Sequence, residues 1–190
     1  MATHPALTKR DCPDPGDQNA LIEMNEIPYQ AAVGSLLYVA MFTRPDIAFS
    51  VQCVSQFNSN PGLIHWAAVK RIFRYLRGTA DYCLVLGGDY QNGINLQGWS
   101  DVDFARDPDD RRSIAGFAFT FGRGVVSFGS KKQPTVALST AEAEYMAAAT
   151  AGREAVWLQT LLHELRLKVS LPTNIFCDNR SAIHLAEEVG

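Results

Sequence analysis

The sequence lacks the cysteine spacing of a zinc site or of a disulfide framework. Its four cysteines are far apart and form no Cys-x-x-Cys pair: Cys12, Cys53, Cys83 and Cys177. It also lacks a run of about 20 apolar residues, because its longest apolar stretch, residues 31–42, contains Gly34 and Ser35. Residues 1–18 lack the apolar centre of a secretory signal. We therefore expect an intracellular protein, of the cytoplasm or the nucleus, that does not enter a membrane.

Positive charge is also scarce. The formal net charge of the 190 residues is −3, so any binding of nucleic acid must come from a local basic patch rather than from the overall charge. Hydrophobic residues make up 47% and charged residues 19% of the chain, which is typical of a globular protein with a real core. The length allows one ordinary domain with a smaller unit and excludes a whole polymerase.

The first part of the chain is expected to hold an irregular leader followed by helices. Residues 1–27 show no periodicity and contain several prolines, which predicts a mostly irregular leader. Three helical patterns follow, and they begin at Pro28, at residues 43–46 and near Ile64. A short β-like run at residues 83–86 closes this part, so we assign residues 28–88 to a helical segment.

The third helical pattern, residues 64–77, carries a basic face. Four cations lie off its apolar side and are candidate nucleic-acid-binding residues: Lys70, Arg71, Arg74 and Arg77. Such a face can follow the phosphates of a nucleic acid. An ordinary solvated face is an equally good interpretation of the same pattern.

Residues 89–190 predict a mixed α/β sheet. Three strands are expected at residues 94–101, 114–121 and 125–130, the last two joined by a tight hairpin at residues 122–124. A long helix over residues 139–166 follows, then a short strand at 174–177 and a helix that begins near Asn179. This order gives an antiparallel meander, a crossover helix and one further parallel strand.

Three carboxylates occupy distinctive places in this predicted sheet. Asp101 ends the first strand, although Asp103 lies on the same side of an extended chain and periodicity does not choose between them. On the long helix, Ser139 and Glu142 fit a capping box, whereas Glu144 falls on the stripe that faces the sheet. A carboxylate on that stripe needs a partner, a proton or a metal. Its plainer interpretation is a partly solvated group stabilised by the helix dipole.

The third carboxylate, Asp178, lies between a strand and a helix, where ligand sites gather in open α/β sheets. Helix capping by Asp178 or Asn179 is the alternative. Three carboxylates without His or Cys in matching positions suit Mg²⁺ or Mn²⁺, and a pair of such ions suits phosphodiester hydrolysis. The four histidines have no ligand spacing and are expected at the surface or as caps: His4, His65, His163 and His184.

Several motifs in this order resemble copia-type retrotransposon Pol polyproteins, at the end of the reverse transcriptase and in the RNase H domain that follows it. In the first half they are Tyr29–Tyr38 (YQAAVGSLLY), TRPDIA at 43–48 and KRIFRYLRGT at 70–79. In the second half they are SDVD at 100–103, DDRRS at 109–113, SKKQ at 130–133, AEAEY at 141–145 and CDNRSA at 177–182. The resemblance covers residues 20–190.

This resemblance implies an RNase H-like fold and a ribonuclease H activity that cleaves the RNA strand of RNA–DNA hybrids during retrotransposon replication. It implies catalytic and metal-binding roles for Asp101, Glu144 and Asp178, with Mg²⁺ or Mn²⁺ as the cofactor. Lys131 and Lys132 become candidates for phosphate contacts, with a solvated hairpin edge as the alternative. The implied partners are the hybrid and the remainder of the Pol polyprotein.

The sequence also departs from the family. It stops before the family's segment with a His and a fourth catalytic Asp, so we expect an incomplete domain and an incomplete two-metal site. Asp109-Asp110 lacks the preceding Tyr of a polymerase active site, which excludes a polymerase. The alternative function is therefore a catalytically inactive, retrotransposon-derived fragment that acts at most as a nucleic-acid or protein-binding module.

Overall fold

The computed structural model describes residues 7–87 and 95–188, and the chain divides into two compact units. Unit 1 comprises Met1–Cys83 and Asp107–Asp110, and unit 2 comprises Leu84–Arg106 and Arg111–Gly190. The domain boundary predicted at residues 88–89 lies outside the described residues. Within the described ranges, no helix combines the length and the apolar character that crossing a bilayer requires.

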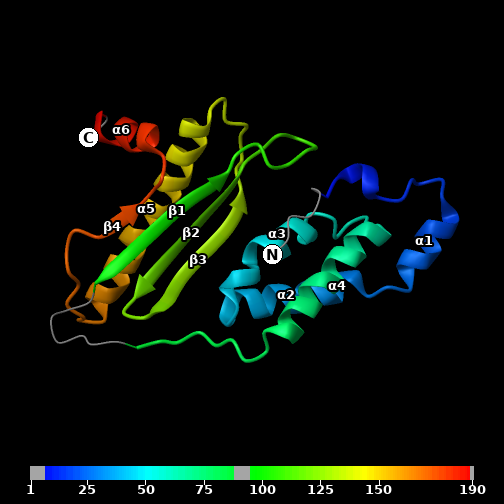
Figure 1. Cartoon of the computed structure of the whole chain (residues 1–190), viewed down its shortest axis with the longest axis horizontal. Helices are drawn as coiled ribbons and strands as arrows, with labels where there is room; N and C mark the ends of the chain where they lie inside the picture. Colours follow the sequence, from blue (N-terminus) through cyan, green and yellow to red (C-terminus); the bar gives the residue numbers. More distant parts are fainter. Residues whose placement is uncertain (1–6, 88–94, 189–190) are drawn as a thin grey trace. The chain divides into compact units, whose positions relative to one another are not determined.

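Unit 1 is helical, as predicted. It contains α1 (Gln18–Asn25), α2 (Tyr29–Phe42), α3 (Ala48–Ser55) and α4 (Leu63–Gly78), with short 3-10 turns η1 (Lys9–Asp11) and η2 (Pro45–Ile47) (Figure 1). Apolar side chains repeat every third or fourth residue on α2, α3 and α4, and these stripes meet in one core. Its fully buried members include Val33, Leu36, Ile47, Val51 and Val69.

Two local predictions in this part were wrong. The leader is less irregular than expected, because α1 forms at Gln18–Asn25. A local cap explains this helix, since Asp17 Oδ1 accepts a hydrogen bond from the Ala20 N–H. The helix was not predicted because its sequence has no apolar periodicity. The predicted β-like run at 83–86 forms no strand, and only Gly87 makes an isolated bridge, to Gly122.

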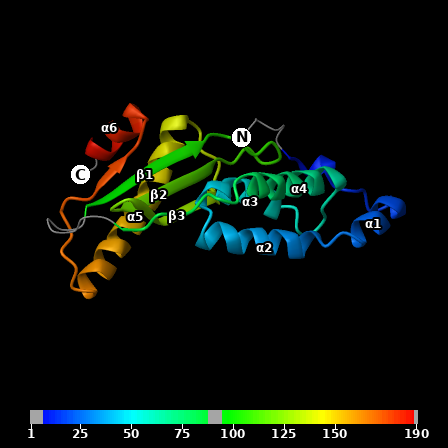
Figure 2. The same cartoon turned by 60° about the horizontal axis from the view of Figure 1, so that its bottom comes forward.

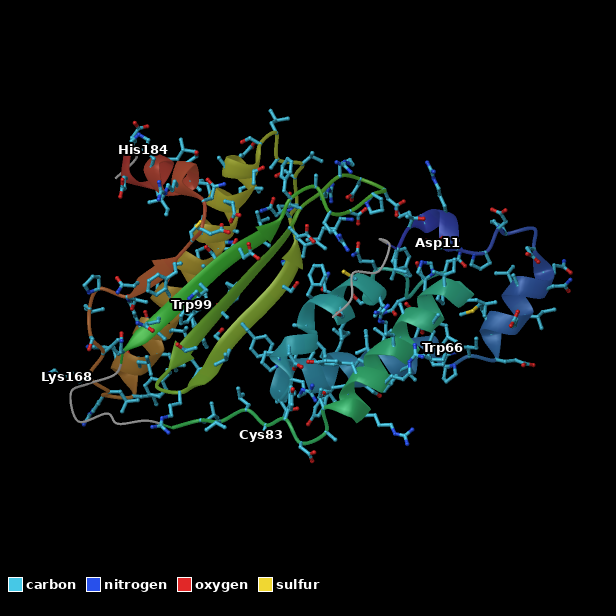
Figure 3. All side chains as sticks on the ribbon, viewed as in Figure 1. Asp11, Trp66, Cys83, Trp99, Lys168 and His184 are labelled. Carbon is cyan, nitrogen blue, oxygen red and sulfur yellow. The ribbon has the colours of Figure 1, made fainter. Side chains whose placement is uncertain are left out.

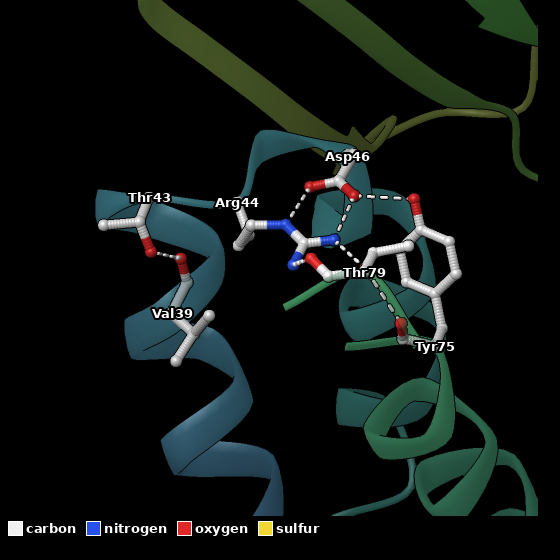
Figure 4. A network of polar contacts seen from close by, with 6 residues as sticks. All are labelled: Val39, Thr43, Arg44, Asp46, Tyr75 and Thr79. Carbon is white, nitrogen blue, oxygen red and sulfur yellow. Dashed lines mark hydrogen bonds and ion pairs between the residues drawn. The ribbon is translucent and has the colours of Figure 1, made fainter. Parts of the chain in front are cut away.

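A buried arginine joins the start of η2 to the end of α4 within unit 1 (Figure 4). The guanidinium of Arg44 donates to both carboxylate oxygens of Asp46, at 2.9 and 2.8 Å, and to the Thr79 carbonyl at 3.0 Å. It also donates to Thr79 Oγ1 at 2.6 Å, while the Tyr75 hydroxyl donates to Asp46 at 2.8 Å. These contacts fix the polypeptide where it leaves α4.

Unit 2 contains the predicted mixed sheet. Its strands are β1 (Leu96–Asp103), β2 (Ile114–Phe121), β3 (Gly124–Lys132) and β4 (Asn174–Phe176), in the order β3-β2-β1-β4. β1, β2 and β3 pair antiparallel, and β4 pairs parallel to β1 after the crossover helix α5 (Thr140–Glu164). The helix α6 (Arg180–Glu188) follows β4. The predicted fold class is confirmed, and the arrangement is consistent with an RNase H-like fold.

The helix α5 covers one face of this sheet (Figure 2). Leu96 and Phe119 pack against Ala151, Ala155 and Leu158 near one end of the interface. Val102 packs with Ala137, Ala143 and Ala147 near the other. Small residues on α5 let the helix approach the strands closely. On the sheet's second face, the side chains of Trp99 (labelled in Figure 3) and Phe176 are 41% and 47% exposed, with ring centroids 5.6 Å apart.

Gly98 in β1 gives a direct test of this packing. A Cβ at Gly98 would lie 2.4 Å from Phe119 Cε1, in a ring that is fully buried. We expect Gly98→Ala to lower the free energy of unfolding of unit 2 by about 1–3 kcal/mol through overpacking. Gly116→Ala in β2 is the matched control, because its Cβ would meet nothing closer than 3.8 Å. Urea unfolding of both variants measures the difference, and equal midpoints would contradict this description of the interface.

Candidate functional site

Asp101 does not end its strand as expected, because β1 continues to Asp103, and Asp178 lies two residues after the end of the adjacent β4. β4 pairs with β1 in parallel, and its last pair is Phe176 with Trp99. Asp101 and Asp178 each lie two residues further along, so continuing the register would place them opposite each other. Neighbouring strands are about 5 Å apart, which is close enough for both carboxylates to act on one ligand. Both side chains are exposed.

Glu144 approaches the same place from α5. The helix begins after Ser139, whose hydroxyl accepts a hydrogen bond from the Glu142 N–H at 3.1 Å. The Glu142 side chain turns back and accepts from the Leu138 N–H at 2.7 Å, so it serves the helix end and stays exposed. Glu144 instead points to the sheet and is only 4% exposed. The prediction that Glu144, and not Glu142, lies on the core-facing stripe is confirmed.

The electrostatics of Glu144 are those of a buried acid beside two others. Burial is the largest cause that raises the pKa of Glu144, and together with the negative charges of Asp101 and Asp178 it brings this pKa to about 7. Its one side-chain hydrogen-bond contact within residues 7–87 and 95–188 is the thiol of Cys177. A buried carboxylate without a cation is unfavourable unless it keeps its proton or gains a metal ion.

The structure distinguishes Asp101 from Asp103, which the sequence did not. Asp101 is close enough to Glu144 to raise its pKa. Asp103 forms an ion pair with Arg106 at 3.4 Å and is not among the charges that act on Glu144. The structure thus brings the carboxylates of Glu144 and Asp178 together, and it links Asp101 to them through the effect of its charge on Glu144.

Capping accounts for Asn179 and not for Asp178. The Asn179 side-chain oxygen accepts a hydrogen bond from the Ala182 N–H at 3.0 Å, which caps the start of α6. The adjacent Asp178 is left to face the other two acids. Helix capping, which the sequence offered for Asp178 or Asn179, therefore applies to Asn179.

Cys177 is the residue that sequence reasoning missed. Its Sγ lies 4.0 Å from Glu144 Oε2, and the ligand atoms of Glu144, Cys177 and Asp178 all lie within 4.8 Å of one another. The expectation of a donor set without cysteine is wrong at this position. Cys177 was set aside because it belongs to no Cys-x-x-Cys pair, and its position directly before Asp178 was the available signal.

The donor set fits a divalent cation. Carboxylate oxygens are the ligands that Mg²⁺ and Mn²⁺ prefer, and Glu144 supplies a buried negative charge that has no cation beside it. The hydroxyl of Ser100, next to Asp101 in β1, is also buried without a hydrogen-bond partner among the described residues. Asp101, Glu144 and Asp178 would hold such an ion.

The basic candidates belong to different units. In unit 1, the side chains of Lys70, Arg74 and Arg77 are exposed on one side of α4, at positions i, i+4 and i+7, and Arg71 is half-buried. In unit 2, Lys131 and Lys132 are the last residues of β3, which runs two residues further than predicted. Lys131 is exposed and Lys132 is half-buried.

His65 caps its helix but does not lie at the surface. The side chain is fully buried, its Nδ1 accepts a hydrogen bond from the Gly62 N–H at 2.8 Å, and its ring stacks on Phe57 with centroids 3.9 Å apart. The capping alternative is confirmed and the surface alternative is wrong. A histidine at the third position of a helix that begins after glycine was the signal.

Comparison with known proteins finds relatives along nearly the whole chain. The chain is 46% identical over 187 residues to "Retrovirus-related Pol polyprotein from transposon TNT 1-94" of Nicotiana tabacum. It is 40% identical over 188 residues to "Retrovirus-related Pol polyprotein from transposon RE2" of Arabidopsis thaliana. These matches cover 98% and 97% of this chain but only 14% and 12% of the two polyproteins.

A shorter relative also matches. The chain is 47% identical over 135 residues to "Secreted RxLR effector protein 161" of Plasmopara viticola, and the match covers 71% of this chain and 94% of that protein. No family model matches the sequence. No solved structure matches the fold.

Proposed function

This chain is homologous to a segment of copia-type retrotransposon Pol polyproteins, and from this premise we propose that it is a metal-dependent ribonuclease H that cleaves the RNA strand of RNA–DNA hybrids. The observation that carries the proposal is Glu144, a buried acid with no cation, next to Asp101 and Asp178. Because the homologues are much longer proteins, the other parts of such a polyprotein are the proposed partners of this segment.

The side chains provide a rigid, negatively charged site. Glu144 is held by α5 and shielded from water, whereas Asp101 lies in β1, Asp178 lies two residues after β4, and both side chains are exposed. When bound, Mg²⁺ or Mn²⁺ supplies a nucleophilic water and stabilises the charge on the leaving oxygen. Hydrolysis would break the bond from phosphorus to the 3′ oxygen and leave a 3′-hydroxyl and a 5′-phosphate, with Asp101, Glu144 and Asp178 as the residues that would hold the ion. The three carboxylates orient this chemistry toward one phosphate.

Selection of the RNA strand would depend on its 2′-hydroxyls, which line the wide minor groove of a hybrid. Phosphate contacts are proposed for the lysines at the end of β3, Lys131 and Lys132. The basic side of α4 is a second proposed contact, through Lys70, Arg71, Arg74 and Arg77. Contacts of this kind weaken steeply with salt, because each one releases a counterion from the duplex.

The test is cleavage of a labelled RNA–DNA hybrid with Mg²⁺ or Mn²⁺ by the chain and by Asp101→Asn. We expect the variant to lose cleavage by at least about 100-fold, the scale on which active-site electrostatics act. Asp103→Asn is the matched control, since it removes the same charge from the same side of β1. The native Asp103 side chain is paired with Arg106 rather than placed beside Glu144. Asp103→Asn should retain cleavage.

Three results would contradict the proposal. Cleavage by Asp101→Asn at the original rate would exclude a role of this acid, and equal losses in both variants would point to the overall charge of the strand. A wild-type chain that binds the hybrid without cleaving it would identify a nucleic-acid-binding module instead.

A further inference from the structure

We propose that Cys177, Glu144 and Asp178 form a zinc site, through which Zn²⁺ displaces the magnesium ion of the proposed nuclease. The binding itself rests on the geometry of these three residues. Only its consequence, inhibition of hybrid cleavage, rests on the proposed function.

The three side chains already converge. Cys177 Sγ is 4.0 Å from Glu144 Oε2, and one ligand atom from each of the three residues lies within 4.8 Å of the others. In tetrahedral zinc coordination, with Zn–S and Zn–O bonds of usual length, a sulfur and an oxygen lie about 3.6 Å apart. A movement of a few tenths of an ångström therefore closes the first pair around an ion. Three protein ligands leave the fourth position to water, as in open zinc sites.

The burial of Glu144 is a second observation that supports a cation at this cluster. Glu144 is only 4% exposed, and among the described residues no donor or cation outside the cluster contacts its carboxylate. The ionised form of a carboxylate held in this way by a helix and a sheet is costly without a positive partner. Its aim at Cys177 and Asp178 places that positive partner among these three side chains.

The thiol decides which cation binds most tightly. A thiolate is a soft ligand that favours zinc, whereas Mg²⁺ takes oxygen ligands and gains nothing from sulfur. On binding, the Cys177 thiol gives its proton to the buffer and the thiolate forms the bond to zinc. Since Glu144 and Asp178 are then occupied, they are no longer available to magnesium. The chain should therefore lose hybrid cleavage at zinc concentrations far below those of magnesium.

Cobalt, which replaces zinc in tetrahedral sites and absorbs light, provides the test. Co²⁺ titrated into the full chain without any nucleic acid should produce a thiolate-to-cobalt charge-transfer band, and Zn²⁺ should remove it by displacement. Cys177→Ser should lack the band and bind Zn²⁺ about 100-fold more weakly or worse, at least as much as losing an outer-shell partner costs. Cys83→Ser is the matched control, because Cys83 is exposed and distant in sequence from the site.

The outcomes separate this proposal from the proposed nuclease. The band with Cys83→Ser and its loss with Cys177→Ser establish the zinc site, whether or not the chain cleaves a hybrid. Absence of the band in the wild-type chain, or an equal band in Cys177→Ser, overturns it. Cleavage that persists at Zn²⁺ concentrations that displace Co²⁺ from the site rejects the inhibition and keeps the site.

Discussion

Replacing Glu144 by glutamine is expected to stabilise the metal-free chain by about 2–3 kcal/mol at pH 8 and to abolish hybrid cleavage. The gain follows from burial. Glu144 is 4% exposed and lies beside Asp101 and Asp178, so its negative charge is both desolvated and repelled. Glutamine has nearly the same shape and carries no charge, so the penalty disappears. The same change removes a metal ligand.

The pH dependence has a definite direction. In the unfolded chain this carboxyl releases its proton near its ordinary pKa of 4.5, whereas burial and the two neighbouring acids raise the pKa of Glu144 to about 7 in the folded chain. Between these values the folded state binds more protons than the unfolded state. The stability that the protonated carboxyl preserves is thus fully present below pH 4.5 and is lost as the pH rises through about 7. Glutamine at this position should make the free energy of unfolding nearly constant over that window.

Scanning calorimetry in a chelating buffer at pH 5 and pH 8 measures both effects. A gain of this size should raise the Tm of unit 2 at pH 8 by several degrees, with a smaller rise at pH 5. Glu142→Gln is the matched control, because Glu142 lies on the same helix, is exposed and keeps an oxygen to accept from Leu138. An unchanged or lowered Tm for Glu144→Gln at pH 8, with Glu142→Gln unaffected, would show that Glu144 is stabilised by something else.

Adding Mn²⁺ should reverse the order of the two proteins. A ligand that binds only the folded state stabilises it in proportion to the logarithm of its concentration. The wild-type chain should gain stability with each increment of Mn²⁺, and Glu144→Gln should gain far less. Parallel gains would exclude Glu144 as a ligand. The instability that Glu144 causes in the metal-free chain would then not be explained by a role in metal binding.

The sheet and the buried acid were predictable because each depends on a local period. Short β-like runs indicated β2 and β3, and the turn at residues 122–124 indicated their hairpin, so the meander followed. The helical period of 100° per residue separated Glu144 from Glu142 without any tertiary information. Where a pattern determines which side of an element a residue occupies, the sequence is sufficient.

Features that depend on another element were not predictable. Asp101 and Asp103 have the same phase on β1, and only the end of β4 opposite Trp99 distinguishes them. Cys177 has no cysteine pair in the sequence, and its approach to Glu144 arises from the packing of α5 on the sheet. His65 was buried by contact with Phe57, which lies outside its helix. In each case a neighbour that is distant in sequence supplies the missing information.

Replacing Arg44 by methionine is expected to destabilise unit 1 by about 2–4 kcal/mol, the scale on which breaking a buried, hydrogen-bonded ion pair acts. Methionine fills a similar volume but donates no hydrogen bond. The Thr79 carbonyl would lose its donor, and Asp46 would lose two charge-assisted bonds. The side chain of Asp46 is 35% exposed, so water recovers part of its loss and keeps the effect below that of a fully buried pair.

Hydrogen exchange across α4 measures this change in unit 1 without interference from unit 2. Protection of the amides of residues 63–79 should fall in Arg44→Met, whereas Thr43→Ala should change it little, because Thr43 makes only an exposed contact to the Val39 carbonyl at 3.4 Å. The pH dependence of this protection is a second test. The hydrogen bond from Arg44 holds the pKa of Asp46 below its usual range. Wild-type protection is therefore present above pH 4 and falls as the pH drops through that lowered value. Arg44→Met should lack most of this acid dependence. Equal protection in the two variants would mean that the apolar core alone fixes the end of α4, and that the arginine network follows the fold rather than stabilising it.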